Sequence, residues 1–200
     1  MHISEGVLSG PVLASGAILT VAGTAIGLKG LDYERIAGAG MLSAAFFVAS
    51  LVHVPVGPSS VHLILNGIVG LLLGWAAFPV ILVALLLQAV FFQFGGITTL
   101  GVNTLIMALP AVACYYLFGR LIRKGGPATT FAAAFACGFV AVLLAALVAG
   151  AALMFTEEGF FEVAGLIVGA NLPVMVIEGA ITGFCVAFLK KVRPEMLPVP

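Results

Sequence analysis

Long apolar segments, separated by short clusters of glycine, proline and charged residues, run through this chain from end to end. A helix needs roughly 20 apolar residues to cross a bilayer, so seven helices would use about 140 of the 200 residues. Only 8% of the residues are charged and 62% are hydrophobic, which leaves too few polar side chains to cover a surface in water. The sequence therefore predicts a single all-α domain, a polytopic membrane protein with a bundle of about seven transmembrane helices.

The ends of the apolar segments define the expected helices, because glycine, proline and charged residues interrupt helices. Ser59 and Ser60 suit the N-cap of the third helix, and Pro79 suits the first turn of the fourth. The glycine-rich stretch 95–101 is too short to span a membrane and is expected to be a loop folded against the bundle. Residues 159–169 are expected to form an interfacial piece or an extension of the last helix. The predicted helices are 11–28, 35–54, 61–77, 79–94, 103–124, 128–155 and 171–191.

The basic residues lie in three clusters that predict the orientation of the chain. In a seven-helix bundle these clusters fall in the first loop, the loop between helices five and six, and the C-terminus, which share one side of the membrane. Short cytoplasmic loops are enriched in Lys and Arg, so we expect an outward N-terminus and a cytoplasmic C-terminus in the cytoplasmic (inner) membrane. The outer segments carry acidic charges only, which favours a cationic ligand. The clusters are Lys29 and Arg35; Arg120, Arg123 and Lys124; Lys190, Lys191 and Arg193; the outer acids are Glu5, Glu157, Glu158 and Glu162.

Small residues recur four positions apart in several predicted helices. Such pairs let helix backbones approach closely in lipid. Packing within the bundle is the favoured role, and docking of another membrane protein is the alternative. The pairs are Gly23/Gly27, Ala45/Ala49, Gly70/Gly74, Gly165/Gly169 and Gly179/Gly183.

Charge balance and missing motifs argue against several function classes. The sequence has no G-x-x-x-x-G-K-[ST] P-loop and no glycine-rich dinucleotide fingerprint, so nucleotide hydrolysis and NAD binding are not expected. It has neither H-E-x-x-H nor G-x-S-x-G, which mark common hydrolases. Eight basic residues balance eight acidic ones, which argues against a nucleic acid partner. We expect neither an enzyme nor a resident cofactor.

His2 is the most informative of the three histidines, because it directly follows Met1. The Met1 amine, the backbone amide nitrogen of His2 and its imidazole Nδ1 can close a five-membered and then a six-membered chelate ring on one metal ion. A second imidazole would complete a plane of four nitrogens, which suits Ni²⁺ or Cu²⁺ and is attainable for low-spin Co²⁺. Any histidine at position two satisfies this pattern, so it needs support from elsewhere in the chain.

His62 is the main candidate for the second imidazole. It is expected one residue inside the third helix, where it could point into the outer mouth of the bundle or bond to a carbonyl at headgroup level. Asn66 lies four residues later, so a helix would place both on one face and the amide could orient the imidazole. His53 closes the second helix before Pro55 and is expected to be an interfacial residue rather than a ligand.

Glu178 is the one acidic residue well inside a predicted span. A carboxylate within a membrane is costly, so it normally faces a partner or a cavity. It could pair with polar groups of the loop that ends at Asn103, neutralise an entering cation, or relay a proton; the structural pairing is favoured. Gln88, Gln93 and Asn103 are expected to form hydrogen bonds between helices near the outer end.

Four blocks of sequence resemble a known family, in the same order and across nearly the whole chain. The first block is similar to the M-H-I-x-[ED]-G opening of the cobalt/nickel capture proteins CbiM and NikM. These are the substrate-specific membrane components of energy-coupling factor transporters. The blocks are Met1-His2-Ile3-Ser4-Glu5-Gly6; Gly57-Pro58-Ser59-Ser60-Val61-His62; Gln88 through Phe94-Gly95-Gly96-Ile97-Thr98-Thr99-Leu100-Gly101-Val102-Asn103-Thr104; and Pro173-Val174-Met175-Val176-Ile177-Glu178-Gly179-Ala180-Ile181-Thr182.

The resemblance implies high-affinity uptake of Ni²⁺ or Co²⁺ by a seven-helix protein whose outward N-terminus inserts into the bundle. It implies metal ligands at the Met1 amine, at the amide and imidazole of His2, and at His62. Asn66, His53, Asn103 and Glu178 are expected as accessory or supporting residues.

The resemblance also implies partners. These are a transmembrane scaffold subunit, a pair of cytosolic ATPases and, for some members of the family, a small accessory membrane protein. The expected organisation is a metal-chelating segment over residues 1–10, a helical bundle over 11–191 and a cytoplasmic tail over 192–200.

Two other hypotheses stay open on the sequence. A stand-alone divalent-cation permease or channel could use Glu178 to carry coupled protons. An intramembrane hydrolase could use Ser59 or Ser60 with a histidine. The choice between nickel and cobalt also stays open, because both ions suit four nitrogen ligands.

Overall fold

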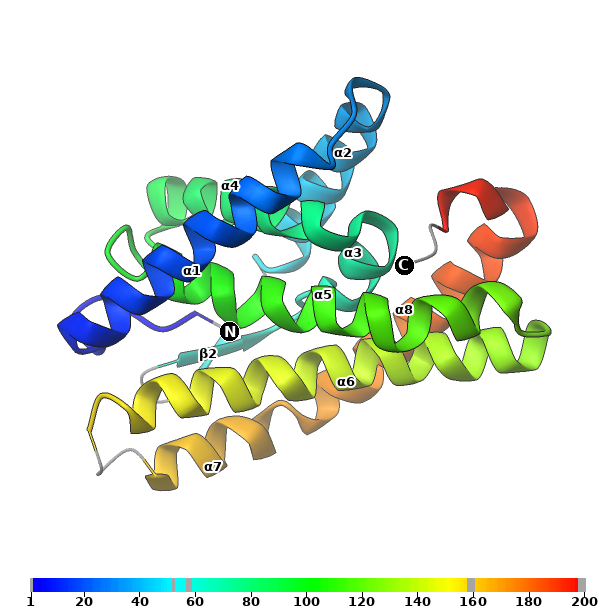
Figure 1. The fold of residues 1–200 in the computed structure, drawn as a ribbon. Coiled ribbons are helices and arrows are strands. Elements are labelled where there is room, and N and C mark those ends of the chain that lie inside the picture. Colours follow the sequence, from blue (N-terminus) through cyan, green and yellow to red (C-terminus); the bar gives the residue numbers. More distant parts are fainter. Residues whose placement is uncertain (1, 52, 57–58, 158–160, 198–200) are drawn as a thin grey trace.

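Uninterrupted apolar segments form the long helices of the structure, a computed structural model that describes residues 2–51, 53–56, 59–157 and 161–197 (Figure 1). The helices pack side by side, and the N-terminal segment folds back into one end of the bundle (Figure 1). The elements are α1 (Gly10–Lys29), α2 (Tyr33–Ala49), β1 (His53–Val56), β2 (Ser59–His62), α3 (Asn66–Leu73), η1 (Gly74–Ala76), α4 (Ala77–Phe92), α5 (Leu100–Lys124), α6 (Pro127–Met154), α7 (Phe161–Ala170), α8 (Leu172–Val192) and η3 (Pro194–Met196).

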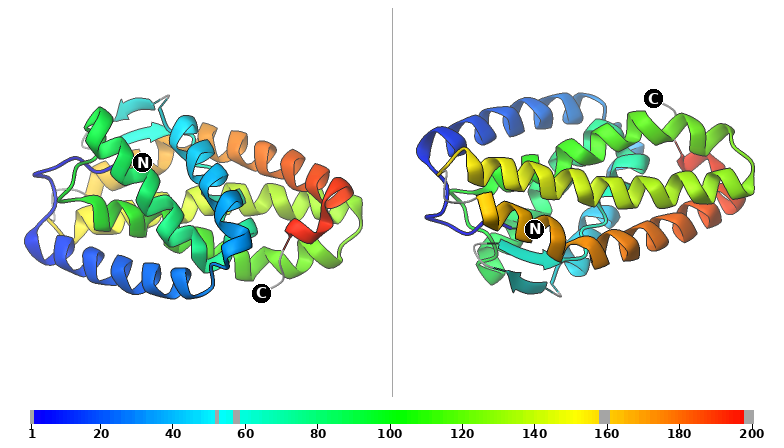
Figure 2. Two further views of the ribbon diagram at one scale, coloured as in Figure 1. Left: turned by 90° about the horizontal axis from the view of Figure 1, so that it is seen from above. Right: turned by 90° about the horizontal axis from the view of Figure 1, so that it is seen from below.

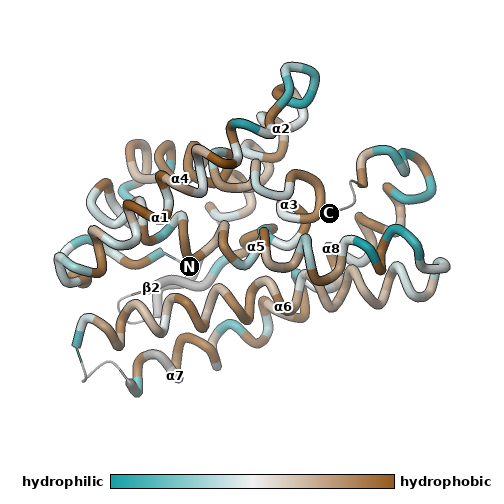
Figure 3. The backbone as a smooth tube through the Cα atoms, viewed as in Figure 1, coloured by the Kyte–Doolittle hydropathy of each residue, from teal (hydrophilic) through white to brown (hydrophobic). Residues whose placement is uncertain are grey.

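The helices confirm the prediction of an all-α membrane protein. Polar residues gather at turns and helix ends, with apolar residues along the helices between them (Figure 3). Strands are limited, in the described part of the chain, to the short hairpin of β1 and β2. Within the described residues, five segments are long and apolar enough, by length and composition, to cross a bilayer, namely Gly10–Lys29, Asn66–Phe92, Leu100–Lys124, Pro127–Met154 and Leu172–Val192.

Helix α6 packs closely against α5 and α8. α6 contacts α5 on one side and α7 and α8 on the other (Figure 2). A Cβ atom added at Gly138 of α6 would lie 2.5 Å from the carbonyl oxygen of Glu178 on α8. The absence of a side chain at Gly138 therefore lets two helix backbones approach closely.

Several of the small-residue pairs also pack inside the bundle, as predicted. Gly23 on α1 faces the ring of Phe78, and a Cβ added at Gly27 would lie 2.7 Å from Pro79 Cδ on α4. In α8, Gly179 and Gly183 face the rings of Phe135 and Phe131 in the same way. By contrast, among the described residues no atom outside the local helix backbone lies within 4 Å of a Cβ added at Gly165 or Gly169.

The predicted C-terminal end of the second helix and the predicted start of the third are wrong. α2 ends at Ala49, and the chain then forms an antiparallel hairpin in which His53 pairs with His62. Ser59 and Ser60 therefore lie in β2 and not at a helix N-cap.

α3 begins only at Asn66, because the residues before it are held in a non-helical conformation by a contact with α8. The main-chain N–H groups of Ile64 and Leu65 donate to the carboxylate of Glu178. Leu65 adopts a left-handed conformation with φ of 55°. Non-helical backbone is tolerated at membrane depth where its polar groups are satisfied by protein, and here a carboxylate satisfies them.

The chain reverses direction at Gly74. Gly70 and Gly74 lie beside Ala111 and Tyr115, so α3 runs in the same direction as α5. α4 then returns to the end of the bundle where the N-terminal segment lies, because Gln88 contacts His2 there. α3 and α4 therefore run in opposite directions, and the third predicted helix is only a short one.

α7 precedes α8 directly, separated from it by Asn171 alone. Both helices lie along α6 (Figure 2). Of the two possibilities for residues 159–169, the extension of the last helix is the correct one for residues 161–169, with a break at Asn171; residues 159 and 160 lie outside the described part of the chain.

The three basic clusters meet at one end of the bundle. Lys190 Nζ donates to the carbonyl oxygens of Ile122 (2.6 Å) and Gly125 (2.7 Å), which joins the end of α8 to the turn between α5 and α6. Arg35 lines a cavity of 440 Å³ together with Glu195, so the start of α2 also lies near the C-terminal segment. The clusters therefore share one side, as the sequence predicts.

Candidate metal centre

The N-terminal segment is inserted into the bundle at the opposite end from the basic clusters. His2 is 5% exposed and Ile3 is fully buried. The side-chain amide of Asn103 binds both main-chain groups of Ile3, with Ile3 N donating to Oδ1 (2.9 Å) and Nδ2 donating to Ile3 O (3.0 Å). Asn103 therefore supplies the bonds that a neighbouring strand would supply, and it holds the segment next to His2.

The loop after α4 closes over this segment, as predicted. Glu5 N donates to Gly95 O (3.2 Å), and Thr98 N donates to Glu5 Oε1 (3.0 Å). Gly95 has φ of +76°, and a Cβ there would lie 2.8 Å from Asn103 Nδ2. Glycine is the residue that adopts this conformation freely and leaves the required space.

His2 and His62 come together although they lie far apart in the sequence. Their ring centroids are 4.6 Å apart and the ring planes are tilted by 31°. His62 is the last residue of β2 and is only 3% exposed. The inserted N-terminal segment and the hairpin thus bring the two singled-out histidines into one buried site.

Gln88 on α4 determines the tautomer of His2. Its Nε2 donates to the carbonyl of Phe47 (3.4 Å) and to the hydroxyl of Ser50, so its Oε1 faces the imidazole. Oε1 lies 2.7 Å from His2 Nε2. An amide oxygen only accepts hydrogen bonds, so Nε2 carries the proton and Nδ1 holds a lone pair. Nδ1 is the nitrogen that a chelate with the N-terminal amine requires.

The carbonyl of Leu63 determines the tautomer of His62. It lies 2.7 Å from His62 Nδ1, and because a carbonyl only accepts, Nδ1 carries the proton and Nε2 holds the lone pair. The sequence allows two roles for His62, a metal ligand or a hydrogen bond to a carbonyl. The hydrogen bond to a carbonyl is present. It is compatible with a ligand role, because a neutral imidazole protonated at Nδ1 has its lone pair on Nε2.

These two ring nitrogens would need main-chain nitrogens to complete a metal site. No group of three or more His, Cys, Asp or Glu side chains gathers within the ranges that the structure describes. In the predicted chelate, the main-chain amide nitrogen of His2 and Nδ1 of the same residue close one ring on the metal. Met1, whose amine is the fourth predicted ligand, lies outside the described residues.

Asn66 does not share a helical face with His62, so that prediction is wrong. His62 lies in β2, before the helix begins. Asn66 is fully buried at the start of α3, and its Nδ2 donates to Met107 O (3.2 Å) and Ala141 O (3.4 Å). Asn66 therefore ties α3 to α5 and α6.

Glu178 has a structural partner, but not the predicted one. Its Oε1 accepts from Ile64 N (2.5 Å) and Leu65 N (2.8 Å), so it binds the chain just after His62 and not the loop that ends at Asn103. The residue is fully buried. The side chain of His53 lies outside the described part of the structure, and its predicted interfacial role stays a prediction.

Sequence reasoning found Gln88 as a polar residue but missed that it orients His2. Gln88 carries the one side-chain amide in the otherwise apolar α4, and this was the available sign that it has a polar partner. The role of the Leu63 carbonyl had no indication, because every residue has a carbonyl and only the fold selects one.

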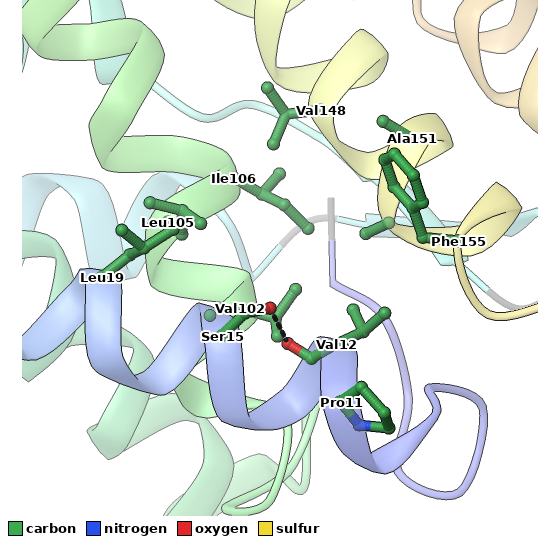
Figure 4. A pocket seen from close by; sticks show the side chains of 12 residues that line it. Pro11, Val12, Ser15, Leu19, Val102, Leu105, Ile106, Val148, Ala151 and Phe155 are labelled. Atoms are coloured by element: carbon green, nitrogen blue, oxygen red, sulfur yellow. Dashed lines mark hydrogen bonds between the residues drawn. The ribbon is translucent and has the colours of Figure 1, made fainter.

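An apolar cavity of 460 Å³ lies near the same end of the bundle, between α1, α5 and α6 (Figure 4). Ser15 carries the one side-chain hydroxyl among its lining residues, and this hydroxyl donates to Val12 O (3.0 Å). Apolar side chains such as Ile106 and Phe155 form its walls. Within the part of the chain that the structure describes, no histidine, cysteine or acidic side chain lines the cavity, so it is separate from the two histidines.

Comparison with known proteins identifies the family. Residues 2–196 match the CbiM family, described as the cobalt uptake substrate-specific transmembrane region. The chain belongs to the CbiM family. A Haemophilus influenzae protein provisionally named a metal transport protein is 44% identical over 98% of this chain and 97% of its own length. The fused nickel transport protein NikMN of Rhodobacter capsulatus is 34% identical over 98% of this chain and 64% of its own length.

A solved structure supports both the fold and the family. The crystal structure of a transition metal transporter superposes with a TM-score of 0.82 and 27% identity, over 96% of this chain and 93% of that one. CbiM is a family of cobalt and nickel uptake proteins and not a family of enzymes. This member is accordingly a multi-pass protein of the cytoplasmic membrane.

Proposed function

We propose that this chain captures Ni²⁺ or Co²⁺ outside the cell as the substrate-binding component of an energy-coupling factor transporter. The observation that carries the proposal is the buried pair of His2 and His62, with ring centroids 4.6 Å apart and with lone pairs on His2 Nδ1 and His62 Nε2. The Met1 amine and the His2 amide nitrogen complete a set of four nitrogens.

Four nitrogens in a plane favour late first-row metal ions. An amide nitrogen binds a metal only when its N–H is lost or strongly polarised, which these ions promote, whereas Mg²⁺ and Ca²⁺ take oxygen ligands. The acidic residues near this end of the bundle, Glu5 and Glu157 among them, attract cations to it. The metal is the transported substrate and not a resident cofactor.

The proposed orientation follows from the two ends of the bundle. The basic clusters mark the cytoplasmic side, so the histidine centre faces outward and the tail after residue 192 is cytoplasmic. The sequence contains no P-loop, so we propose that a transmembrane scaffold subunit and cytosolic ATPases supply the energy. The Rhodobacter capsulatus relative is named a fused nickel transport protein, NikMN, which supports a transporter of several parts. We include a small accessory membrane protein among the proposed parts.

Uptake into vesicles tests this proposal against the stand-alone permease. We expect vesicles that contain only this chain to bind but not accumulate ⁶³Ni²⁺ or ⁵⁷Co²⁺. Accumulation should require the scaffold and ATPase subunits together with ATP. A proton gradient that drives accumulation by this chain alone would contradict the proposal and establish the permease.

Replacement of Gln88 tests the orientation of His2. Gln88→Leu removes the acceptor of the His2 Nε2 proton, so we expect Ni²⁺ affinity to fall about 10- to 100-fold, as for other groups that orient metal ligands. Isothermal titration calorimetry of the purified chain measures this. Gln93→Leu is the matched control, because Gln93 lies outside α4 at its C-cap and forms no bond to His2 among the described contacts. Equal affinities of the two variants would show that Gln88 does not orient the ligand.

A further inference from the structure

One peptide unit links His62 to Glu178. The Leu63 carbonyl accepts the proton of His62 Nδ1 at 2.7 Å. The N–H of Ile64 belongs to the same peptide unit and donates to Glu178 Oε1 at 2.5 Å. Since a peptide unit is planar and rigid, the position of the carboxylate and that of the imidazole are coupled through it.

A second bond makes this arrangement specific. Glu178 Oε1 also accepts from Leu65 N at 2.8 Å, so one carboxylate oxygen holds two successive amides. Leu65 has φ of 55°, a conformation that costs energy for a residue with a side chain. The two bonds to Glu178 offset that cost and satisfy N–H groups that would otherwise be left unpaired inside the bundle.

The carboxylate is itself held in place. Glu178 is fully buried in α8. Its main chain packs directly against Gly138, where an added Cβ would lie 2.5 Å from Glu178 O. Gly138 in turn lies beside Gly67 at the start of α3. The carboxylate therefore projects from a tightly packed junction of three helices toward the segment that carries His62.

We propose that Glu178 is a positioning residue for the metal centre, acting on His62 through the Leu63–Ile64 peptide; this inference depends on the proposed function. In many metal sites a carboxylate binds the ligating histidine directly, which sets its tautomer and raises its basicity. Here a peptide group stands between the two. Hydrogen bonds in series polarise one another, so the carboxylate makes the Leu63 carbonyl a better hydrogen-bond acceptor. This in turn makes His62 Nε2 a better electron-pair donor to the metal.

Three substitutions at Glu178 separate position from charge. Glu178→Ala removes both bonds, and Glu178→Asp keeps the charge but is too short to reach both amides. Both should weaken Ni²⁺ binding by about 10- to 100-fold, the range for lost supporting partners of metal ligands. Glu178→Gln retains an oxygen at the same reach and should stay within a few-fold of the unmodified chain. Thr182→Val, one turn further along α8 and also buried, is the control and should bind normally.

Binding is followed by calorimetry with Ni²⁺ and by the visible and EPR spectra of Cu²⁺, which report the nitrogen ligands directly. We expect altered Cu²⁺ spectra for Glu178→Ala and Glu178→Asp and an unaltered one for Thr182→Val. Where Glu178→Ala does not fold, as judged by gel filtration, the comparison of Glu178→Asp with Glu178→Gln decides. Spectra and affinities of Glu178→Ala and Glu178→Asp that match those of Thr182→Val would overturn the inference.

The variant His62→Ala separates this inference from the function it depends on. If His62→Ala binds Ni²⁺ as tightly as the unmodified chain, the proposed ligand set is wrong. If His62→Ala loses binding while Glu178→Ala and Glu178→Asp keep it, the positioning role alone is wrong. In the His62→Ala background, residual Cu²⁺ binding by His2 should no longer respond to Glu178→Ala; an equal response in both backgrounds would mean that Glu178 acts elsewhere.

Discussion

One extra residue before Met1 should abolish tight binding of Ni²⁺ and Co²⁺. The extension converts the primary amine into a peptide nitrogen and removes the first chelate ring. It would also displace the segment at His2, which is 5% exposed and has no room to shift beside the buried Ile3. We expect affinity to fall on the order of 1000-fold, which corresponds to about 4 kcal/mol of binding free energy.

Calorimetry on protein with a C-terminal affinity tag free of histidine measures this effect. The same residue added at the C-terminus is the matched control and should leave affinity unchanged. His2→Ala and His62→Ala should reproduce the loss, whereas His53→Ala should not. Tight binding by the N-terminally extended chain would rule out the amine as a ligand.

Gly70→Ala should strongly destabilise the bundle. A Cβ at Gly70 would overlap the carbonyl oxygen of Ala111 and would lie 2.6 Å from its carbonyl carbon. These are main-chain atoms of α5, so no side-chain rotation relieves the overlap and α3 must move away. Overpacking of this kind costs about 3 kcal/mol at the upper end of the usual range. We expect a markedly lower thermal unfolding temperature in detergent.

Gly165→Ala on α7 is the matched control for this substitution. In the described part of the chain, no atom beyond the local helix backbone lies within 4 Å of a Cβ added at Gly165, and alanine has a higher helix propensity than glycine. The unfolding temperature of this variant should stay the same or rise slightly. If Gly70→Ala unfolds at the same temperature as Gly165→Ala, α3 does not pack on α5 as described.

The helices that were predicted best are those whose ends are marked locally. α6 was expected over 128–155 and covers Pro127–Met154, because Gly125 and Gly126 precede it and its interior is continuously apolar. The same local punctuation placed α1 and α8 within a residue or two. Such boundaries depend on hydrophobic burial and on glycine and proline conformations, both of which are properties of nearby residues.

The region 50–66 was predicted poorly for the opposite reason. Its apolar residues suit a helix, yet the chain forms a hairpin and then a left-handed turn at Leu65. The group that stabilises this turn is Glu178, which lies far along the sequence. A distant carboxylate that replaces helical hydrogen bonds leaves no local pattern.

The candidate site divides in the same way. The order Met1-His2 and the identity of His62 are covalent facts, so the sequence alone determined which nitrogens could form a chelate, and hydropathy alone determined that the chain lies in a membrane. Only the tertiary structure decided that His2 and His62 meet. It also decided the tautomers: the bond to Gln88 places the lone pair of His2 on Nδ1, and the bond to the Leu63 carbonyl places the lone pair of His62 on Nε2. Chelate rings and apolar length are set by neighbours along the chain, whereas the contact between two rings and the choice of tautomer depend on groups that folding brings together.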